Sequence, residues 1–291
     1  MKKTIFSKIL SVTSVSLLTL LSLSVDVKSQ EADSKPPTCP NNPSDLSIVD
    51  GFCVLTPEEY GVKIYEMGIC TSNPIVNNKL SKENCFISLV KSSPAFTNVA
   101  GGNSLLLNSD TQLKEKRPKA QDYTHAYIVI SPEFKLKFTY RLNNTTYYSN
   151  GVNSSAFSPK PNATTTPPAK SFIETLNDFG DPEEGFSPSA AAQVTGGTIT
   201  ALLTDSNLER STSAASTSRL VGVFVPTNPI SISDDTKGLE VKFVVTDQGG
   251  GVESCAGGGF DEEEERFGPP EGIDQVCQFG SGPFSALFTP Y

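Results

Sequence analysis

Residues 123–142 read YTHAYIVISPEFKLKFTYRL and carry the clearest structural signal in the chain. Within 123–130, both alternating sets of side chains are at least half apolar, which predicts a strand buried on both faces in a sheet or sandwich. Within 134–142, aromatic and aliphatic residues alternate with basic ones, which predicts a strand with one buried and one solvated face. Ser131-Pro132-Glu133 lies between them and predicts the turn of a hairpin.

The same alternation predicts short strands on both sides of this segment. Thr56-Pro57-Glu58-Glu59 is typical of a helix start, with a hydroxyl cap, a first-turn proline and two carboxylates, but alternation follows from Tyr60 to Cys70. Further strands are expected at 85–90, 104–107, 147–148, 198–203, 220–225, 239–246 and 284–288. With 22 glycines and 21 prolines marking frequent turns, the pattern predicts an all-β, mainly antiparallel fold of sandwich or jelly-roll type.

One short helix is expected at 171–180. Phe172, Leu176 and Phe179 recur at helical spacing, Ser171 can cap the start, and Gly180 can end it.

The division of the chain leaves two arrangements open. Residues 151–170 are dominated by Asn, Ser, Thr, Pro and Gly, which predicts a linker or a long surface loop. This segment would separate a β-rich portion at 46–150 from a second at 171–291, and the alternative is one large sandwich with a long loop. Residues 30–45 are polar and proline-rich, and we expect a lead-in that Cys39 attaches to the body.

The first 29 residues have the pattern of a secretory signal peptide. Lys2, Lys3 and Lys8 precede an apolar, hydroxyl-bearing stretch at 9–25, and short residues then lead to an expected cleavage after Ser29. The stretch is too short and too polar for a good membrane span, which needs about 20 mainly apolar residues. We therefore expect a secreted, periplasmic or cell-surface protein without a membrane span after cleavage; a retained anchor is the alternative.

Six cysteines fit an oxidising compartment, where an even number predicts disulfides. Six cysteines allow 15 pairings, and the sequence does not select one of them. We expect the local pairing, in which each bond closes a loop of roughly 15 to 23 residues and contributes about 3 kcal/mol. The expected pairs are Cys39 with Cys53, Cys70 with Cys85, and Cys255 with Cys277. A zinc site would need short Cys-x-x-Cys spacing and usually histidines, and the sequence has neither.

The charge of the chain bears on its partners. Cleavage removes four lysines and one aspartate, which changes the net charge from −9 to −12. So acidic a chain repels nucleic acids and anionic membrane surfaces. The expected partner is therefore a protein or glycan at the cell surface, or a second copy of the same chain.

Catalytic chemistry finds little support in the sequence, and no catalytic residue is predicted. His125 is the only histidine and would have to be the base of any triad, yet it lies mid-strand, and no G-x-S-x-G motif is present. The favoured function is a non-catalytic surface, structural or binding protein. The alternative is a carbohydrate-active enzyme or sugar-binding module, because abundant carboxylates leave a glycosidase pair possible.

An acidic run is the main candidate for a bound metal. It would form a low-affinity Ca²⁺ site, because hard cations prefer clustered carboxylates. Its members are Asp261, Glu262, Glu263, Glu264 and Glu265. Consecutive like charges also favour a solvated loop, which is the more ordinary interpretation, and EF-hand spacing is absent. Asp234, Asp235 and Asp247 are weaker candidates, and no other cofactor is expected.

Four N-x-S/T sequences begin at Asn143, Asn144, Asn153 and Asn162. They cluster around the loop region, so we expect all four asparagines to be exposed and open to glycosylation in a host that modifies such sites.

Overall fold

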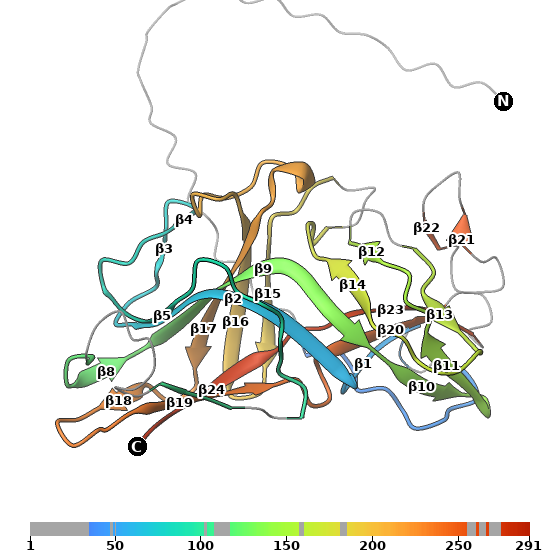
Figure 1. The fold of residues 1–291 in the computed structure, drawn as a ribbon, viewed down its shortest axis with the longest axis horizontal. Helices are drawn as coiled ribbons and strands as arrows, with labels where there is room; N and C mark the ends of the chain where they lie inside the picture. The colour runs from blue at the N-terminus through green and yellow to red at the C-terminus, as the bar shows by residue number, and fades with distance from the viewer. Residues whose placement is uncertain are drawn as a thin grey trace, which may run out of the picture. The chain divides into compact units, whose positions relative to one another are not determined.

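Strand β9 (His125–Lys137) organises the fold. One edge of β9 pairs along its length with β2 (Glu59–Cys70), and Figure 1 shows these two long, curved strands running together. On the other edge, the first half of β9 pairs with β17 (Arg219–Pro226) and the second half with β14 (Phe172–Thr175). All three pairings are antiparallel.

The computed structural model describes most of the chain after residue 34. The described residues are 35–46, 49, 51–101, 104–107, 117–156, 160–180, 185–254, 260–261, 266–267 and 275–291. They belong to one compact unit, Glu31–Tyr291.

Nine strands form the largest sheet. Its main path runs β12, β14, β9, β17, β16, β15, and β2 also pairs with β5 and β6. The strands not yet introduced are β12 (Ser154–Ser155), β16 (Gly197–Thr204), β15 (Ser189–Val194), β5 (Cys85–Val90) and β6 (Thr97–Asn98). Strands from both 46–150 and 171–291 therefore share one sheet, and the pairing crosses the segment 151–170.

Smaller sheets complete the fold. Three of them contain three strands each. The first consists of β1 (Phe52–Leu55), β20 (Gly250–Ser254) and β23 (Val276–Ser281), and the second of β24 (Ser285–Pro290), β19 (Leu239–Val244) and β7 (Ser104–Leu107). The third consists of β10 (Thr139–Leu142), β11 (Thr145–Ser149) and β13 (Ala163–Thr164). Three are strand pairs: β3 (Ile75–Val76) with β4 (Lys79–Leu80), β8 (Gln121–Tyr123) with β18 (Ile230–Ile232), and β21 (Phe260–Asp261) with β22 (Arg266–Phe267).

Both faces of the central strand are buried, as its sequence predicts. On one face, Ile128 and Ile130 belong to the main core, together with residues of β19, β20 and β23. On the other face, Tyr127 and Val129 join a second, smaller core that Leu80 of β4 helps to form. The expectation of a nearly all-β, mainly antiparallel fold is confirmed, and one sheet packs on others in a sandwich-like manner.

The helix expected at 171–180 is wrong, because Phe172–Thr175 is strand β14. Phe172 and Glu174 point into the interior and alternate with half-buried Ile173 and Thr175, which is the period of a strand. Hydrogen bonding to β9 across 133–136 supplies the backbone partners that a helix would have found within itself. The described residues contain no α-helix, and their helical conformation is limited to 3-10 turns such as Ala214–Ser216.

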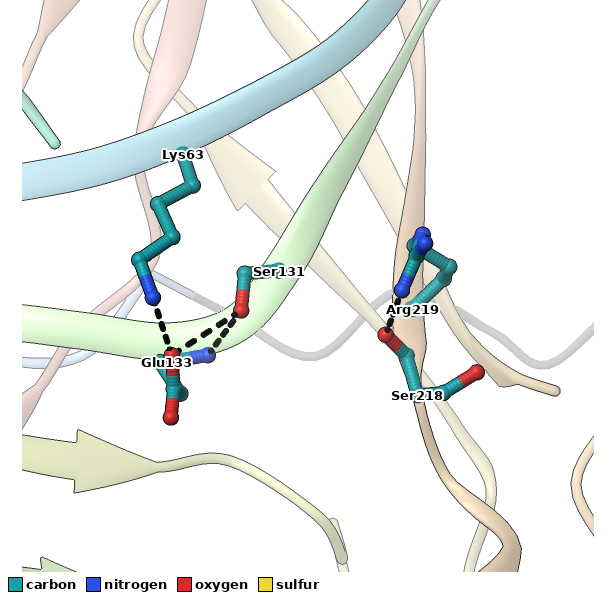
Figure 2. A network of polar contacts seen from close by, with 5 residues as sticks. All are labelled: Lys63, Ser131, Glu133, Ser218 and Arg219. Carbon is teal, nitrogen blue, oxygen red and sulfur yellow. Dashed lines mark hydrogen bonds and ion pairs between the residues drawn. The ribbon is translucent and has the colours of Figure 1, made fainter. Parts of the chain in front are cut away.

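The hairpin turn expected at Ser131-Pro132-Glu133 is also wrong, because β9 continues through it. The pairing with β2 shifts register there, so the extra residues form a bulge, a place where a strand tolerates proline. Figure 2 shows how side chains hold this bulge. The Ser131 hydroxyl accepts the Glu133 N–H at 3.2 Å, and the ammonium of Lys63 on β2 lies 2.6 Å from the Glu133 carboxylate.

The helix start expected at Thr56-Pro57-Glu58-Glu59 leads instead directly into β2. The carboxylates of Glu58 and Glu59 form ion pairs with Lys137 and Lys135 of β9, at 2.9 and 2.8 Å. The two carboxylates thus bind lysines of the neighbouring strand and do not cap a helix N-terminus. Each exposed pair contributes at most about 1 kcal/mol.

Two of the expected disulfides are confirmed, Cys39–Cys53 and Cys70–Cys85. Cys277 is also disulfide-bonded, and Cys255, its expected partner, lies outside the described residues. The bonds indicate an oxidising, extracellular type of environment. Among the helices of the described residues, none has the length and apolar character that crossing a membrane requires.

Candidate functional site: an apolar cavity

A cavity of about 270 Å³ lies between one face of the large sheet and the connection from β23 to β24. The large sheet contributes residues of β2, β9, β17, β16 and β15, and residues 281–284 lie in or next to the connection from β23 to β24. Pro36, Leu176 and Phe179 complete the wall. Nearly all of these side chains are apolar.

The cavity exists because a row of small residues crosses the sheet. Ala190 of β15, Ala201 of β16, Gly222 of β17 and Ile128 of β9 are successive cross-strand partners. Directly opposed residues have their side chains on the same face of the sheet. On this face the row therefore carries the methyl groups of the two alanines and the hydrogen of the glycine, followed by the large side chain of Ile128. The rows on either side contain larger residues, such as Ile199 and Leu220, and a trough results between them.

Gly222 marks the depth of this trough. A Cβ added there would meet only side-chain atoms, Ile128 Cγ2 at 3.1 Å and Ile199 Cδ1 at 3.7 Å. Both side chains border the cavity, so they have space into which they can move.

Tyr60 and Ser281 are the lining residues of the cavity with hydroxyl groups. The fully buried Tyr60 hydroxyl donates a hydrogen bond to the Gly282 carbonyl at 3.2 Å, and burial raises the pKa of Tyr60 well above its ordinary value. Ser281 lines the cavity beside it, and its N–H donates to the Glu174 carboxylate at 2.6 Å. Burial raises the pKa of Glu174, while hydrogen bonds from the Ser281 hydroxyl and backbone act in the opposite direction.

The wall at Phe179 is held by Asp178, which is almost fully buried. Its carboxylate accepts the N–H groups of Gly180 at 2.9 Å and Ser187 at 2.8 Å, and the Phe179 N–H donates to the Ser187 carbonyl at 2.9 Å. Gly180 has no room for a Cβ, which would lie 2.8 Å from the Gly185 carbonyl oxygen. The loop that carries Phe179 is therefore fixed by its own backbone contacts.

The arrangement suits retention of an apolar molecule. Among the lining residues, all of which are described, none is basic, and the Tyr60 hydroxyl already uses its hydrogen on the Gly282 carbonyl. Apolar walls with a few placed polar groups are the usual composition of a small-molecule site.

His125 does not take part in this site. It lies opposite Cys70 on β2, and its Nδ1 is 2.8 Å from the Thr124 hydroxyl. That hydroxyl donates its hydrogen to the Thr71 carbonyl at 2.9 Å, so Nδ1 acts as the donor toward Thr124. Burial lowers the pKa of His125, which favours the neutral ring.

The acidic candidates do not come together in the described part of the chain. Glu262–Glu265 lie outside the described residues, as does the side chain of Asp261, whose backbone belongs to β21. Asp247 occupies a turn in which its N–H donates to the Thr56 hydroxyl at 2.9 Å, and the Asp234 carbonyl accepts from Arg117. The described residues contain no group of three or more potential metal ligands.

One of the four asparagine predictions is wrong. Asn162 is fully buried, and its side chain forms two hydrogen bonds to the Phe279 backbone, accepting at 2.7 Å and donating at 2.8 Å. It therefore mimics a neighbouring strand and is closed to glycosylation in the folded protein. Asn143 and Asn144 lie in an exposed turn, and the Asn153 side chain accepts the Ile173 N–H at 2.8 Å.

The cavity itself is not among the sites that sequence reasoning finds. The available signal is the run Ala190-Ala191-Ala192 together with Gly222, small residues within strands that otherwise favour bulky side chains.

No protein-family profile matches the sequence, and it matches neither a curated protein nor a solved structure. Its function is therefore inferred from its own sequence and geometry.

Proposed function

We propose that this chain is an exported, non-catalytic binding protein that holds a small apolar ligand in the cavity beneath β15, β16 and β17. The signal-peptide pattern at 1–29 and the confirmed disulfides support a role outside the cytoplasm. The observation that carries the proposal is the cavity at the row Ala190, Ala201 and Gly222.

The size of the cavity supports a ligand. Small-molecule sites usually measure about 300 to 1,000 Å³, and an apolar cavity of about 150 Å³ is large enough to bind benzene. The walls of this space are mostly apolar, so an empty site leaves apolar surface exposed to water, which is unfavourable. A ligand that fills the space covers this surface.

Binding of a fluorescent apolar probe, N-phenyl-1-naphthylamine, to the oxidised mature chain (30–291) tests the proposal. Ala201→Phe places a ring in the trough and should abolish binding. Thr200→Phe is the matched control, because Thr200 is exposed on the opposite face of the same strand and should leave binding unchanged. A wild type that does not bind the probe, or an Ala201→Phe variant that binds it normally, would refute the proposal.

A sugar-binding module is the second candidate, and a separate hollow of about 380 Å³ favours it. This hollow offers hydrogen-bonding and charged groups from Glu83, Asn84, Arg117, Lys119 and Gln121. A glycan array tests this candidate, and Gln121→Ala should lower any signal that the hollow produces.

A further inference from the structure

One part of the cavity wall comes from residues 36–39, a segment that we call the strap. Pro36 lines the cavity. Each of the other lining residues belongs to a strand or to a connection between two strands, whereas Pro36 lies ahead of β1, the first strand of the described chain. Proline has no N–H to donate, so the position of Pro36 depends on packing and on the attachment of the residues that follow it.

The residues after Pro36 are attached to β1. The Val54 N–H donates to the Pro37 carbonyl at 2.8 Å, and the Val54 carbonyl accepts the Cys39 N–H at 2.7 Å. The Cys39–Cys53 disulfide joins the same two segments. Because Cys53 and Val54 are completely buried, β1 gives the strap a fixed support.

The sheet that carries the strap also leads to another part of the cavity wall. β1 pairs with β20, and β20 pairs with β23, whose last residue, Ser281, lines the cavity. The connection from Ser281 to Phe284 continues this wall. Three hydrogen-bonded strands therefore join the strap to the residues at 281–284, and both parts of the wall depend on one small sheet.

The disulfide limits how far the strap can move away from the cavity. Segments near a chain terminus that are held by few contacts open locally at a small cost in free energy. Breaking the two hydrogen bonds to Val54 would release the strap, but the Cys39–Cys53 bond keeps it attached to β1. Without this bond, Pro36 would spend less time against the cavity, and a bound molecule would lose part of its contacts.

We propose that the strap is the adjustable wall of the cavity, and that the Cys39–Cys53 bond determines how firmly this wall closes on a bound ligand. The inference rests on the proposed function and adds its regulation, since a chain in which this bond has not formed would hold the ligand poorly. Disulfides persist in oxidising compartments, so the site becomes fully competent only outside the cytoplasm.

Release of N-phenyl-1-naphthylamine from the oxidised mature chain, followed by stopped-flow fluorescence after dilution, tests this inference. Replacing Cys39 and Cys53 by serine should speed release about tenfold, because the strap opens more often. Replacing Cys70 and Cys85 by serine is the matched control and should leave release unchanged. The two bonds have sequence separations of 14 and 15, so their loss affects global stability almost equally, but Cys70 belongs to the smaller core, away from this wall.

A second pair of variants keeps both disulfides and decides the test if the Cys39–Cys53 variant does not fold. Pro36→Gly removes the ring from the wall and should speed release severalfold. Pro37→Gly is its control, because Pro37 is exposed and its carbonyl can still accept from Val54. Both replacements give the unfolded chain similar additional freedom, so a difference between them reports on the wall.

The outcomes separate this inference from the proposed function. If Pro36→Gly releases the naphthylamine no faster than Pro37→Gly, or the folded Cys39–Cys53 variant no faster than the Cys70–Cys85 variant, the strap is not the adjustable wall. The cavity would then remain a binding site. A wild type that binds no naphthylamine would overturn both proposals.

Discussion

Replacing Gly222 by alanine should stabilise the protein, because the methyl group would enter the cavity. The added Cβ meets Ile128 Cγ2 at 3.1 Å, a close contact, but Ile128 borders open space and can shift by a few tenths of an ångström. Loss of glycine's freedom in the unfolded chain contributes about 0.4 to 1 kcal/mol, and burial of one methyl group about 0.8 kcal/mol. After allowance for the close contact, we expect a gain of about 1 kcal/mol.

Urea unfolding of the oxidised mature chain measures this gain, and the midpoint of thermal unfolding should rise by about 3 °C. Gly250→Ala is the matched control, because its Cβ would lie 2.1 Å from a ring carbon of the fully buried Phe138. That variant should be destabilised by several kcal/mol, as overpacked cores are. If Gly222→Ala also loses 1 kcal/mol or more, the space at Gly222 does not exist and the account of the cavity is wrong.

Three further perturbations probe the rest of the fold. Replacing Cys70 and Cys85 by serine should cost about 3 kcal/mol in urea unfolding, because a 15-residue loop is released in the unfolded chain. Asn162→Ala should cost about 2 to 4 kcal/mol in the same assay, since it leaves the Phe279 N–H and carbonyl unsatisfied in the interior. Because burial raises the pKa of Glu174, the folded state holds its proton more tightly than the unfolded chain, so its contribution to stability is present below pH 4.5 and is lost as pH rises through the folded pKa. Glu174→Gln should therefore make the stability depend less on pH. Urea unfolding midpoints of wild type and variant, measured from pH 4 to pH 8, test this.

Each of these expectations has a contrary result. A serine double variant as stable as wild type would show that the Cys70–Cys85 bond does not constrain the unfolded chain. An Asn162→Ala variant within 0.5 kcal/mol of wild type would mean that water or a neighbour satisfies Phe279. A Glu174→Gln variant with the same pH dependence as wild type would assign that dependence to other groups.

Strand positions are predictable from the sequence because burial imposes a local period. The segment 123–130 alternates apolar side chains on both faces, and β9 is indeed buried on both. Cys85–Val90 and Ser104–Leu107 are strands with the expected bounds. The pairs Asn77-Asn78 and Asn143-Asn144 have positive φ and form two-residue turns between strands, a sequence signal that could have located two hairpins.

The errors arise where tertiary pairing decides between local alternatives. Phe172 fits both a helical and a strand period. The segment becomes strand β14 because it pairs with the edge of β9. Ser131-Pro132 resembles a turn, but β2 pairs with β9 on both sides of it, so the extra residues form a bulge. Neither partner is visible within a short window of sequence.

The cavity could not be predicted from the sequence, for a related reason. Ala190, Ala201 and Gly222 are separated along the chain and become neighbours only through the register of β15, β16 and β17. A shift of one residue in either pairing would move some of them to the opposite face, and the trough would disappear. The first four cysteines, in contrast, pair with near neighbours in the sequence, and the expected local pairing agrees with the two bonds Cys39–Cys53 and Cys70–Cys85.

The most direct test of the cavity is a crystal structure of the oxidised mature chain under xenon pressure, since dry apolar cavities bind xenon. Xenon should lie about 4 Å from the side chains of Ala201 and Phe284 and from the Gly222 Cα. A structure without xenon at this place, in which Phe284 packs directly on Gly222, would contradict the account.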